Sequence, residues 1–288
     1  MKLAKARPYL MIAPAMAVIG VFSLYPVAYM LYLSFFKWNM MGPKIFIGLK
    51  NYGDMLSSTD FRQVLGNSLE YMLLSVVAAV SLSFLLALFL RKNTAVNRFL
   101  QASVFAPYVI SFVSIAFIWS WFMDSDYGLL NYVLKLIGLP AVDWLNDPHV
   151  ALKSLVIVSV WKGLGFDTLL FVSAFHTIPA YLYEAARLDK ARPFAVFRKI
   201  TLPMLSPTLF FIILTNIIAS FKTFETISIM TQGGPLNSTD TLAYYIYQYG
   251  FKFFKIGYAS AVGVALMLLV GIFTILYFLT LGRRVHYR

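Results

Sequence analysis

Residues 68–90 read SLEYMLLSVVAAVSLSFLLALFL, and after Glu70 this stretch holds no charged side chain. A helix needs about 20 apolar residues to cross a hydrocarbon core roughly 30 Å thick. The stretch does not alternate polar and apolar residues, as the strands of a membrane β-barrel do. With five similar stretches, it predicts an all-α membrane protein with six transmembrane helices, near residues 9–36, 68–90, 102–123, 152–175, 204–224 and 259–281.

The composition of the whole chain supports the same fold class. Of its 288 residues, 60% are hydrophobic and 12% are charged, whereas a soluble domain carries roughly 25% charged residues. So few charges cannot cover a water-exposed surface, and a soluble globular protein is excluded. Cysteine is missing from the sequence, which excludes disulfides and thiolate metal sites. No polar linker separates an independent module, so we expect a single transmembrane domain over residues 1–288.

The first apolar stretch has a second interpretation. Lys2, Lys5 and Arg7 precede it, and a basic segment followed by an apolar run is also the pattern of a secretory signal peptide. The run is longer than the apolar region of a typical signal and contains Pro14 and Pro26. We therefore expect a retained transmembrane helix.

The net charge of +12 predicts an orientation in the membrane and not a nucleic-acid partner. Cytoplasmic loops of membrane proteins carry an excess of Lys and Arg. About 14 of the 24 basic residues lie at the two termini and in the second and fourth connections, so both termini are predicted to be cytoplasmic. These residues are Lys2, Lys5, Arg7, Arg91, Lys92, Arg98, Arg187, Lys190, Arg192, Arg198, Lys199, Arg283, Arg284 and Arg288.

The fourth connection, residues 176–203, reads HTIPAYLYEAARLDKARPFAVFRKITLP. Pro179 and Pro193 can each occupy the first turn of a short helix, which predicts a helix, a turn and a second helix just below the membrane. Glu184 and two small residues, Ala185 and Ala186, would then face a partner protein. A solvated amphipathic loop is the alternative interpretation of the same residues.

The same connection resembles the EAA motif of permease subunits in binding-protein-dependent ABC importers. The matching positions are Glu184, Ala185, Ala186, Asp189, Ala191, Ile200, Leu202 and Pro203, at the spacing of the motif. The one departure is Lys190, where the family usually has Gly, a residue that favours a turn with positive φ.

Further segments resemble the sugar-type permeases, the group of the maltose, lactose and glycerol-3-phosphate importers. They follow the family's order and spacing along nearly the whole chain. The segments are GLKNY at residues 48–52, WKG at 161–163, TQGGP at 231–235 and GYA at 257–259.

The resemblance implies a type I ABC importer-like fold in the plasma membrane of a prokaryote, with membrane lipid around a multi-pass chain. It implies a second related permease, two ABC ATPase subunits and an extracellular solute-binding protein as partners. ATP and Mg²⁺ would bind to the ATPase, and this chain would be neither an enzyme nor a holder of its own cofactor. The residues implied to contact the ATPase are Glu184, Ala185, Ala186, Asp189, Ala191, Phe194, Leu202 and Pro203.

Ionisable residues inside a membrane are costly and point to a solute path. Lys162 and Asp167 lie five residues apart, so they do not share a helix face. Lys162 is interpreted either as a structural clamp to the second permease or to a carbonyl, or as a solute contact. For Lys222 the alternatives are snorkelling to the interface and reception of solute. The predicted path comprises Lys162, Asp167, Asn216, Ser220, Lys222, Phe224 and Glu225.

Two glycines follow Lys162 in the predicted fourth helix. Gly163 and Gly165 are expected to loosen the fourth helix where its backbone lines a cavity.

A secondary carrier driven by an ion gradient would need buried carboxylates, and Asp167 alone lies deep in a predicted helix. An intramembrane enzyme would need paired carboxylates, a Ser/His arrangement or metal ligands, so we predict no catalytic residues and no metal site. The chain has no Gly-Lys pair and therefore no P-loop of its own.

Overall fold

The structure is a computed structural model, and it describes the backbone of residues 2–281 and the side chains of residues 11–280. Arg283, Arg284 and Arg288, used above to orient the C-terminus, lie outside the described residues, as do the side chains of the basic residues at the N-terminus. Two compact units are present: Met1–Phe61 with Tyr245–Leu268, and Arg62–Tyr244 with Leu269–Arg288. The single transmembrane domain over residues 1–288 stays a prediction.

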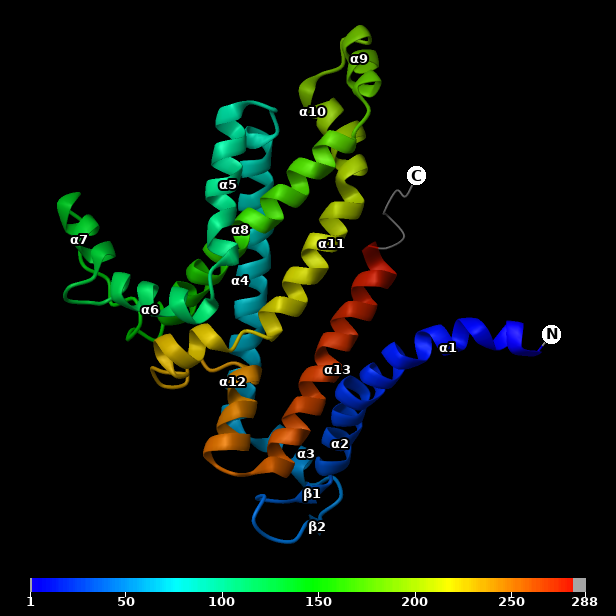
Figure 1. The fold of residues 1–288 in the computed structure, drawn as a ribbon. Helices are drawn as coiled ribbons and strands as arrows, with labels where there is room; N and C mark the ends of the chain where they lie inside the picture. The colour runs from blue at the N-terminus through cyan, green and yellow to red at the C-terminus, as the bar shows by residue number, and fades with distance from the viewer. Residues whose placement is uncertain (1, 282–288) are drawn as a thin grey trace. The chain divides into compact units, whose positions relative to one another are not determined.

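The first unit begins with a long helical run and a hairpin (Figure 1). The run consists of α1 (Lys2–Ile19), a π-helical turn (Gly20–Leu24) and α2 (Tyr25–Leu33). Strands β1 (Phe36–Lys37) and β2 (Ile45–Phe46) pair antiparallel, with Phe36 opposite Phe46. Helix α3 (Lys50–Ser57) follows.

The start of α13 (Ile256–Leu281) packs closely in the same unit. A methyl group at Gly257 would overlap the carbonyl oxygen of Phe36, and one at Gly263 would meet Met30 Sδ at 2.7 Å. Ala259 and Ala261 are buried beside them. Small residues therefore allow the close packing at this end of the last helix.

The second unit is built almost entirely of helices (Figure 1). Most of α4 and the end of α13 belong to it. The helices are α4 (Thr59–Leu90), α5 (Ala95–Val109), α6 (Phe112–Phe122), α7 (Leu129–Leu136), α8 (Ala151–Thr177), α9 (Ala180–Leu188), α10 (Pro193–Val196), α11 (Leu202–Phe221) and the first half of α12 (Leu242–Tyr247). Single π-helical turns lie at Phe197–Thr201, Ile227–Thr231 and Gln248–Lys252, the last of them in the first unit.

Among the described residues, five helices are long and apolar enough to cross a membrane, and the number is six when the bent pair α5 and α6 is counted as one broken span. The prediction of one continuous third helix over residues 102–123 is wrong, because α5 and α6 meet at an angle of 100°. Ile110 and Ser111 are extended between them, with ψ of 143° and 137°, so the helical hydrogen bonds stop there. The other five predicted spans each fall largely on a helical run, although the first, predicted to end at residue 36, ends at Leu33.

The fifth predicted span differs at both ends from the observed helix. It was expected at residues 204–224, but the helical run extends over Pro193–Phe221. The second helix of the fourth connection is thus continuous with the span and not separate from it. Pro203 fits because it lies in the first turn of α11, directly after a π-helical turn.

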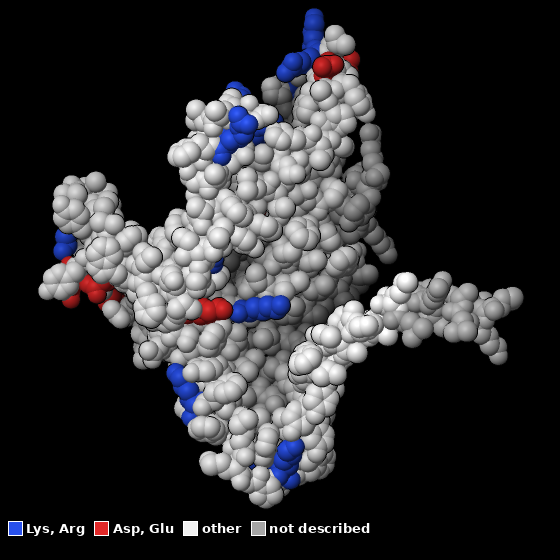
Figure 2. Space-filling model, viewed as in Figure 1, with Lys and Arg blue, Asp and Glu red and all other residues white. Residues whose placement is uncertain are grey.

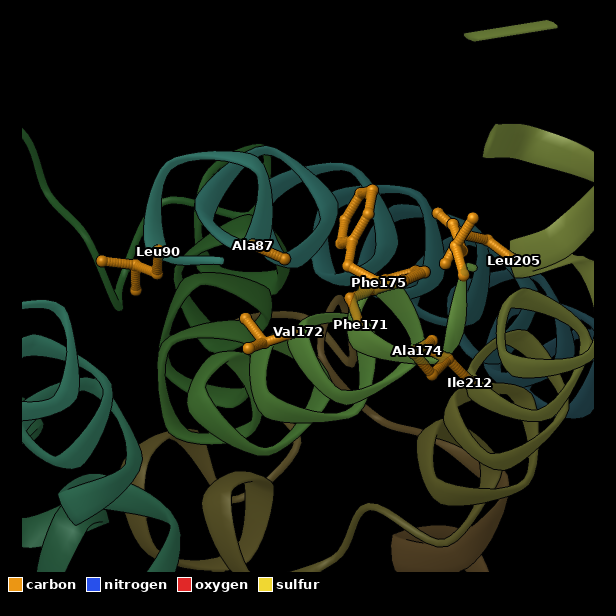
Figure 3. Packing of buried hydrophobic residues seen from close by; sticks show 9 residues of the cluster. Ala87, Leu90, Phe171, Val172, Ala174, Phe175, Leu205 and Ile212 are labelled. Carbon is orange, nitrogen blue, oxygen red and sulfur yellow. The ribbon is translucent and has the colours of Figure 1, made fainter. Parts of the chain in front are cut away.

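A hydrophobic cluster fixes the three long helices of the second unit near the fourth connection (Figure 3). Side chains from α4, α8 and α11 meet there, and α9 and α10 follow directly along the chain from this end of α8. The rings of Phe84 and Phe171 meet edge to face, with centroids 5.4 Å apart. The buried members are Ala87, Leu90, Phe171, Val172, Ala174, Phe175, Ile178, Leu205 and Ile212.

Candidate functional site

The turn after α9 has the hydrogen bonds of a Schellman motif. The amide of Ala191 donates to the carbonyl of Ala186 at 2.9 Å, and the amide of Lys190 donates to the carbonyl of Arg187 at 3.0 Å. Lys190 takes the left-handed conformation that this motif requires, with φ of 50°. The position where the family usually has Gly is therefore the position with positive φ. The local sequence thus forms a capped helix, a tight turn and a second helix, as predicted.

The outer face of α9 is exposed and partly apolar. Glu184 and Ala185 are exposed, and the exposed fractions of Tyr181 and Leu188 are 57% and 84%. Ala186 is buried, so the expectation that it faces a partner is wrong. It faces inward because it lies two residues from both Glu184 and Leu188, and two residues turn a helix by about 200°.

The remaining residues predicted to contact the ATPase lie on the turn and on the following helix. Asp189 is the last residue before the left-handed turn and is exposed, as are Ala191 and Phe194. Leu202 and Pro203, in the first turn of α11, are 38% exposed and half-buried, respectively. The structure thus places these residues on two helices and the turn that joins them.

Contacts with the long helices hold this connection in place. The hydroxyls of Tyr183 and Thr201 lie 3.2 Å apart and join the two helices of the connection. The ring of Phe197 packs on Phe84 of α4, with centroids 6.0 Å apart. A movement of the connection would therefore reach α4 and α11 directly.

Basic residues gather at this end of the second unit, over α9, α10 and the α4–α5 connection (Figure 2). A ring nitrogen of His176 lies 2.7 Å from the carbonyl of Arg91, which joins the second and fourth connections. The two internal connections predicted to be cytoplasmic thus lie at one end of this unit. The orientation of the chain in the membrane stays a prediction.

The second unit also has an open cavity of about 430 Å³. This volume lies within the range of small-molecule sites. Side chains of α4, α5, α6, α8 and α11 and of the segment after α11 line it. They are Tyr71, Ser75, Ala79, Tyr108, Phe112, Ser159, Val160, Lys162, Gly163, Phe166, Asp167, Thr215, Asn216, Ala219, Ser220, Lys222, Thr223 and Glu225.

Lys162 of α8 is buried in the wall of this cavity. Its Nζ donates to the carbonyls of Pro107, Tyr108 and Ile110 at 3.3, 2.9 and 2.7 Å. Of the interpretations of Lys162, the contact with carbonyls is the one that this geometry matches.

Asp167 and Asn216 form a polar link between α8 and α11 in the same cavity. The Asn216 amide donates to Oδ2 of Asp167 at 2.9 Å, and Asp167 is 4% exposed. Lys162 and Asp167 therefore have different partners, as their spacing of five residues predicted. Carboxylate and amide groups of this kind can bind the hydroxyls of a polar solute.

Hydroxyl groups and aromatic rings make up much of the remaining wall. Tyr71 donates its hydroxyl to Ser159 Oγ at 2.6 Å. Ser75 Oγ is buried, lines the cavity and has no hydrogen-bond partner among the described residues. The rings of Tyr108 and Phe166 stack with centroids 4.7 Å apart. A wall with aromatic rings and one unpaired hydroxyl, that of Ser75, suits a ligand with both apolar and hydroxyl surfaces.

Most of the predicted solute-path residues line the cavity, with one exception. Ser220, Lys222 and Glu225 lie in its wall. Phe224 is not among the lining residues, and its ring lies 6.0 Å from that of Tyr244. The reason is that α11 ends at Phe221, so Phe224 does not continue a face of that helix.

Gly163 and Gly165 do not loosen α8, which is continuous over Ala151–Thr177. Gly163 lines the cavity and has open space where a side chain would be. A methyl group at Gly165 would instead overlap the carbonyl oxygen of Val104 in α5. Gly165 therefore allows the close approach of α5 and α8, and the expected loosening is wrong.

Four aromatic residues in the cavity wall were not among the predicted site residues: Tyr71, Tyr108, Phe112 and Phe166. Nothing in the sequence separates them from the other rings, because 17% of the chain is aromatic. The signal that could have pointed to two of them was Lys162, a charged residue in the middle of a predicted span. Its ammonium group lies near the rings of Tyr108 and Phe112. Within residues 11–280, no three His, Asp or Glu side chains come close enough to hold a metal ion.

Comparison with known proteins gives several relatives along nearly the full chain. The sequence is 33% identical over 262 residues to the sulfoquinovosyl glycerol transport system permease of Agrobacterium fabrum, covering 90% of this chain and 85% of that permease. It is 33% identical to the trehalose/maltose transport system permease of Thermococcus litoralis, covering 96% and 93%. It is 31% identical to the sn-glycerol-3-phosphate transport system permease of Agrobacterium fabrum, covering 98% and 97%.

The fold is also that of a known transporter subunit. A chain of a bacterial ABC transporter involved in the import of alginate superposes with a TM-score of 0.85 at 24% identity, covering 98% of this chain and 99% of that one. The family pattern described as a binding-protein-dependent transport system inner membrane component matches residues 79–287. The protein belongs to the family of inner membrane components of binding-protein-dependent transport systems, the ABC permease subunits.

Proposed function

We propose that this chain is the permease subunit of an ATP-driven importer that carries a sugar or oligosaccharide across the plasma membrane of a prokaryote. The exposed face of α9 is the observation that carries the proposal. Tyr181 and Leu188 are large apolar side chains exposed beside Glu184, on a helix outside the predicted membrane spans. Apolar residues exposed in a connection are typical of a surface that another protein covers.

The partner at this surface is a separate ATPase subunit, which binds ATP and Mg²⁺. Glu184, Ala185, Asp189, Ala191, Phe194, Leu202 and Pro203 are the proposed contact residues, and buried Ala186 supports the cap of α9. The Glu184 carboxylate pairs with a basic group of the ATPase. A second permease, a second ATPase and an extracellular solute-binding protein complete the transporter.

The solute class rests on the relatives and on the cavity. The relatives named above carry sulfoquinovosyl glycerol, trehalose or maltose, and glycerol-3-phosphate. Stacked rings at Tyr108 and Phe166 and the hydroxyl of Ser75 suit a carbohydrate, which has apolar ring faces and many hydroxyls. The cavity is thus the proposed solute path, with Asp167 and Asn216 as hydroxyl-binding groups.

Exchange of one charge tests the coupling surface. In Glu184→Lys, the ATPase subunits should no longer co-purify with the permease, because the new cation repels their basic group. The control Asp126→Lys makes the same change of charge at an exposed residue of the α6–α8 connection. It should leave ATPase recruitment unchanged. Normal recruitment and transport in Glu184→Lys would exclude this surface as the docking site.

An ion-gradient carrier is the competing function, and buried Asp167 is the feature that favours it. Uptake into proteoliposomes separates the two. With the complete transporter, uptake should require ATP on the side of the membrane that the ATPase subunits face. It should not change when a proton or sodium gradient is imposed. Uptake driven by an ion gradient without ATPase subunits would overturn the importer assignment.

A further inference from the structure

The break between α5 and α6 leaves backbone carbonyls without helical partners. The last four carbonyls of any α-helix lack an i+4 amide. At this break the amide of Ile110 donates to the carbonyl of Pro107 at 3.3 Å, and Ser111 begins the next helix from an extended backbone. In an apolar environment such carbonyls require another donor.

Lys162 supplies those donors from the neighbouring helix α8. An ammonium group has three N–H donors, and Lys162 has three carbonyl acceptors, those of Pro107, Tyr108 and Ile110. The donor capacity of the side chain is therefore fully used. All three acceptors belong to the backbone, so they do not depend on which side chains surround the break.

Two aromatic rings complete the environment of the ammonium group. Nζ of Lys162 lies 4.7 Å from the ring centroid of Phe112 and 5.5 Å from that of Tyr108. Cations at such distances from a ring face are attracted by it. One ring precedes the break and the other follows it, so the cation attracts both sides of the break.

The residues at the break do not themselves prevent a continuous helix. Ile110 and Ser111 are neither proline nor glycine, and Pro107 already lies inside α5. A helical backbone at these two residues would pair the freed carbonyls with amides of α6. The extended conformation therefore needs stabilisation from outside the segment.

We infer that Lys162 is the positioning residue that keeps α5 and α6 separate and thereby fixes the Tyr108 and Phe112 wall of the cavity. Without its ammonium group, the carbonyls regain partners only if residues 107–114 become helical, which moves both rings. The inference concerns the cavity wall alone and holds whether or not the cavity carries a sugar.

A distance measurement across the break tests the inference directly. Because the chain contains no cysteine, the double variant Val96→Cys with Trp121→Cys gives two unique spin-label sites, both on exposed side chains. The 100° bend places these positions about 24 Å apart, and a straight helix would separate them by about 38 Å. Pulsed electron paramagnetic resonance on the complete transporter in lipid nanodiscs resolves these distances.

Four variants of Lys162 and of a control residue decide the outcome. In Lys162→Met the distance should increase toward the straight-helix value or become broad, and in Lys162→Arg, which keeps the charge and the donors, it should stay narrow and short. Lys222→Met changes a lysine of the same cavity and should match the unmodified chain. A narrow, short distance in Lys162→Met overturns the inference. If that variant does not accumulate, Lys162→Gln, which has two donors and no charge, is judged by the same criterion.

Discussion

The side-chain amide of Asn216 links two helices, because it donates both to Oδ2 of Asp167 on α8 and to the carbonyl of Ile212 in its own helix. Both distances are 2.9 Å, and the two N–H groups of the amide are thereby used. The amide is fixed in orientation, and the buried carboxylate of Asp167 has a donor. This link joins α8 to α11 inside the cavity.

Removal of the amide should destabilise the helix pair and change transport. In Asn216→Ala, the buried carboxylate of Asp167 loses its donor, which costs about 1–3 kcal/mol. Thr215→Ala is the control, because the Thr215 hydroxyl lines the same cavity but donates only to carbonyls of its own helix. Thermal unfolding in detergent should show a larger decrease for Asn216→Ala. Solute uptake should fall while the transporter still assembles, and equal unfolding temperatures for the two variants would contradict the link.

Two glycines two residues apart on α8 should respond in opposite directions to the same substitution. Gly165→Ala forces α5 away from α8, because the added methyl overlaps the carbonyl of Val104, and overpacking of this kind costs about 1–3 kcal/mol. Gly163→Ala meets open space and should stabilise the helix by about 0.5–1 kcal/mol. Melting temperatures of the two variants check the prediction. A stabilised Gly165→Ala would show that the two helices can separate at no cost.

Lys190→Gly should stabilise the turn after α9. A non-glycine residue in the left-handed region costs about 1–2 kcal/mol, and Lys190 has a φ of 50° there. Hydrogen exchange of the α9 amides should become slower in the glycine variant. Lys190→Ala removes the same charge but keeps the strained conformation, so its exchange should match the unmodified chain. Slower exchange in both would assign the effect to charge.

The connection between α6 and α8 should lose order in acid. Hydrogen bonds from Ser125 and Asn146 hold the pKa of Asp143 below its ordinary value of 3.8. A carboxyl whose pKa is lowered by folding stabilises the fold above its unfolded pKa, and this stabilisation is lost as the pH falls through the folded pKa. Hydrogen exchange over residues 124–147 should therefore increase as the pH falls below about 4. In Asp143→Asn, the acid-induced increase in hydrogen exchange over residues 124–147 should be no larger than the increase in neighbouring loops.

The sequence predicted those features that depend on local pattern. The end of the second span at residue 90 and the whole of the fourth span follow from apolar length, because a membrane helix ends where charged residues begin. Positive φ at Lys190 follows from the glycine usual at that position in the family. In each case the determining residues lie within a few positions of the structure that they specify.

Features that depend on a distant residue were not predicted. Residues 102–123 are apolar throughout, and their 100° bend is stabilised by Lys162, which follows Ile110 by more than fifty residues. The end of α11 at Phe221 moved Phe224 out of the cavity, although the predicted span ran to residue 224. Hydropathy records which residues avoid water and not which helix supplies the missing hydrogen bonds.

The unbroken helical run over Pro193–Phe221 has a mechanical consequence. Phe194, on the exposed connection, and Asn216, in the cavity wall, are both part of it, and the helical rise places them about 33 Å apart along one axis. A continuous helix transmits a displacement from one end to the other, and in this run bending is expected only near the π-helical turn at Phe197–Thr201 and at Pro207. The chain thus needs no relay of side chains to carry force from its surface to its interior.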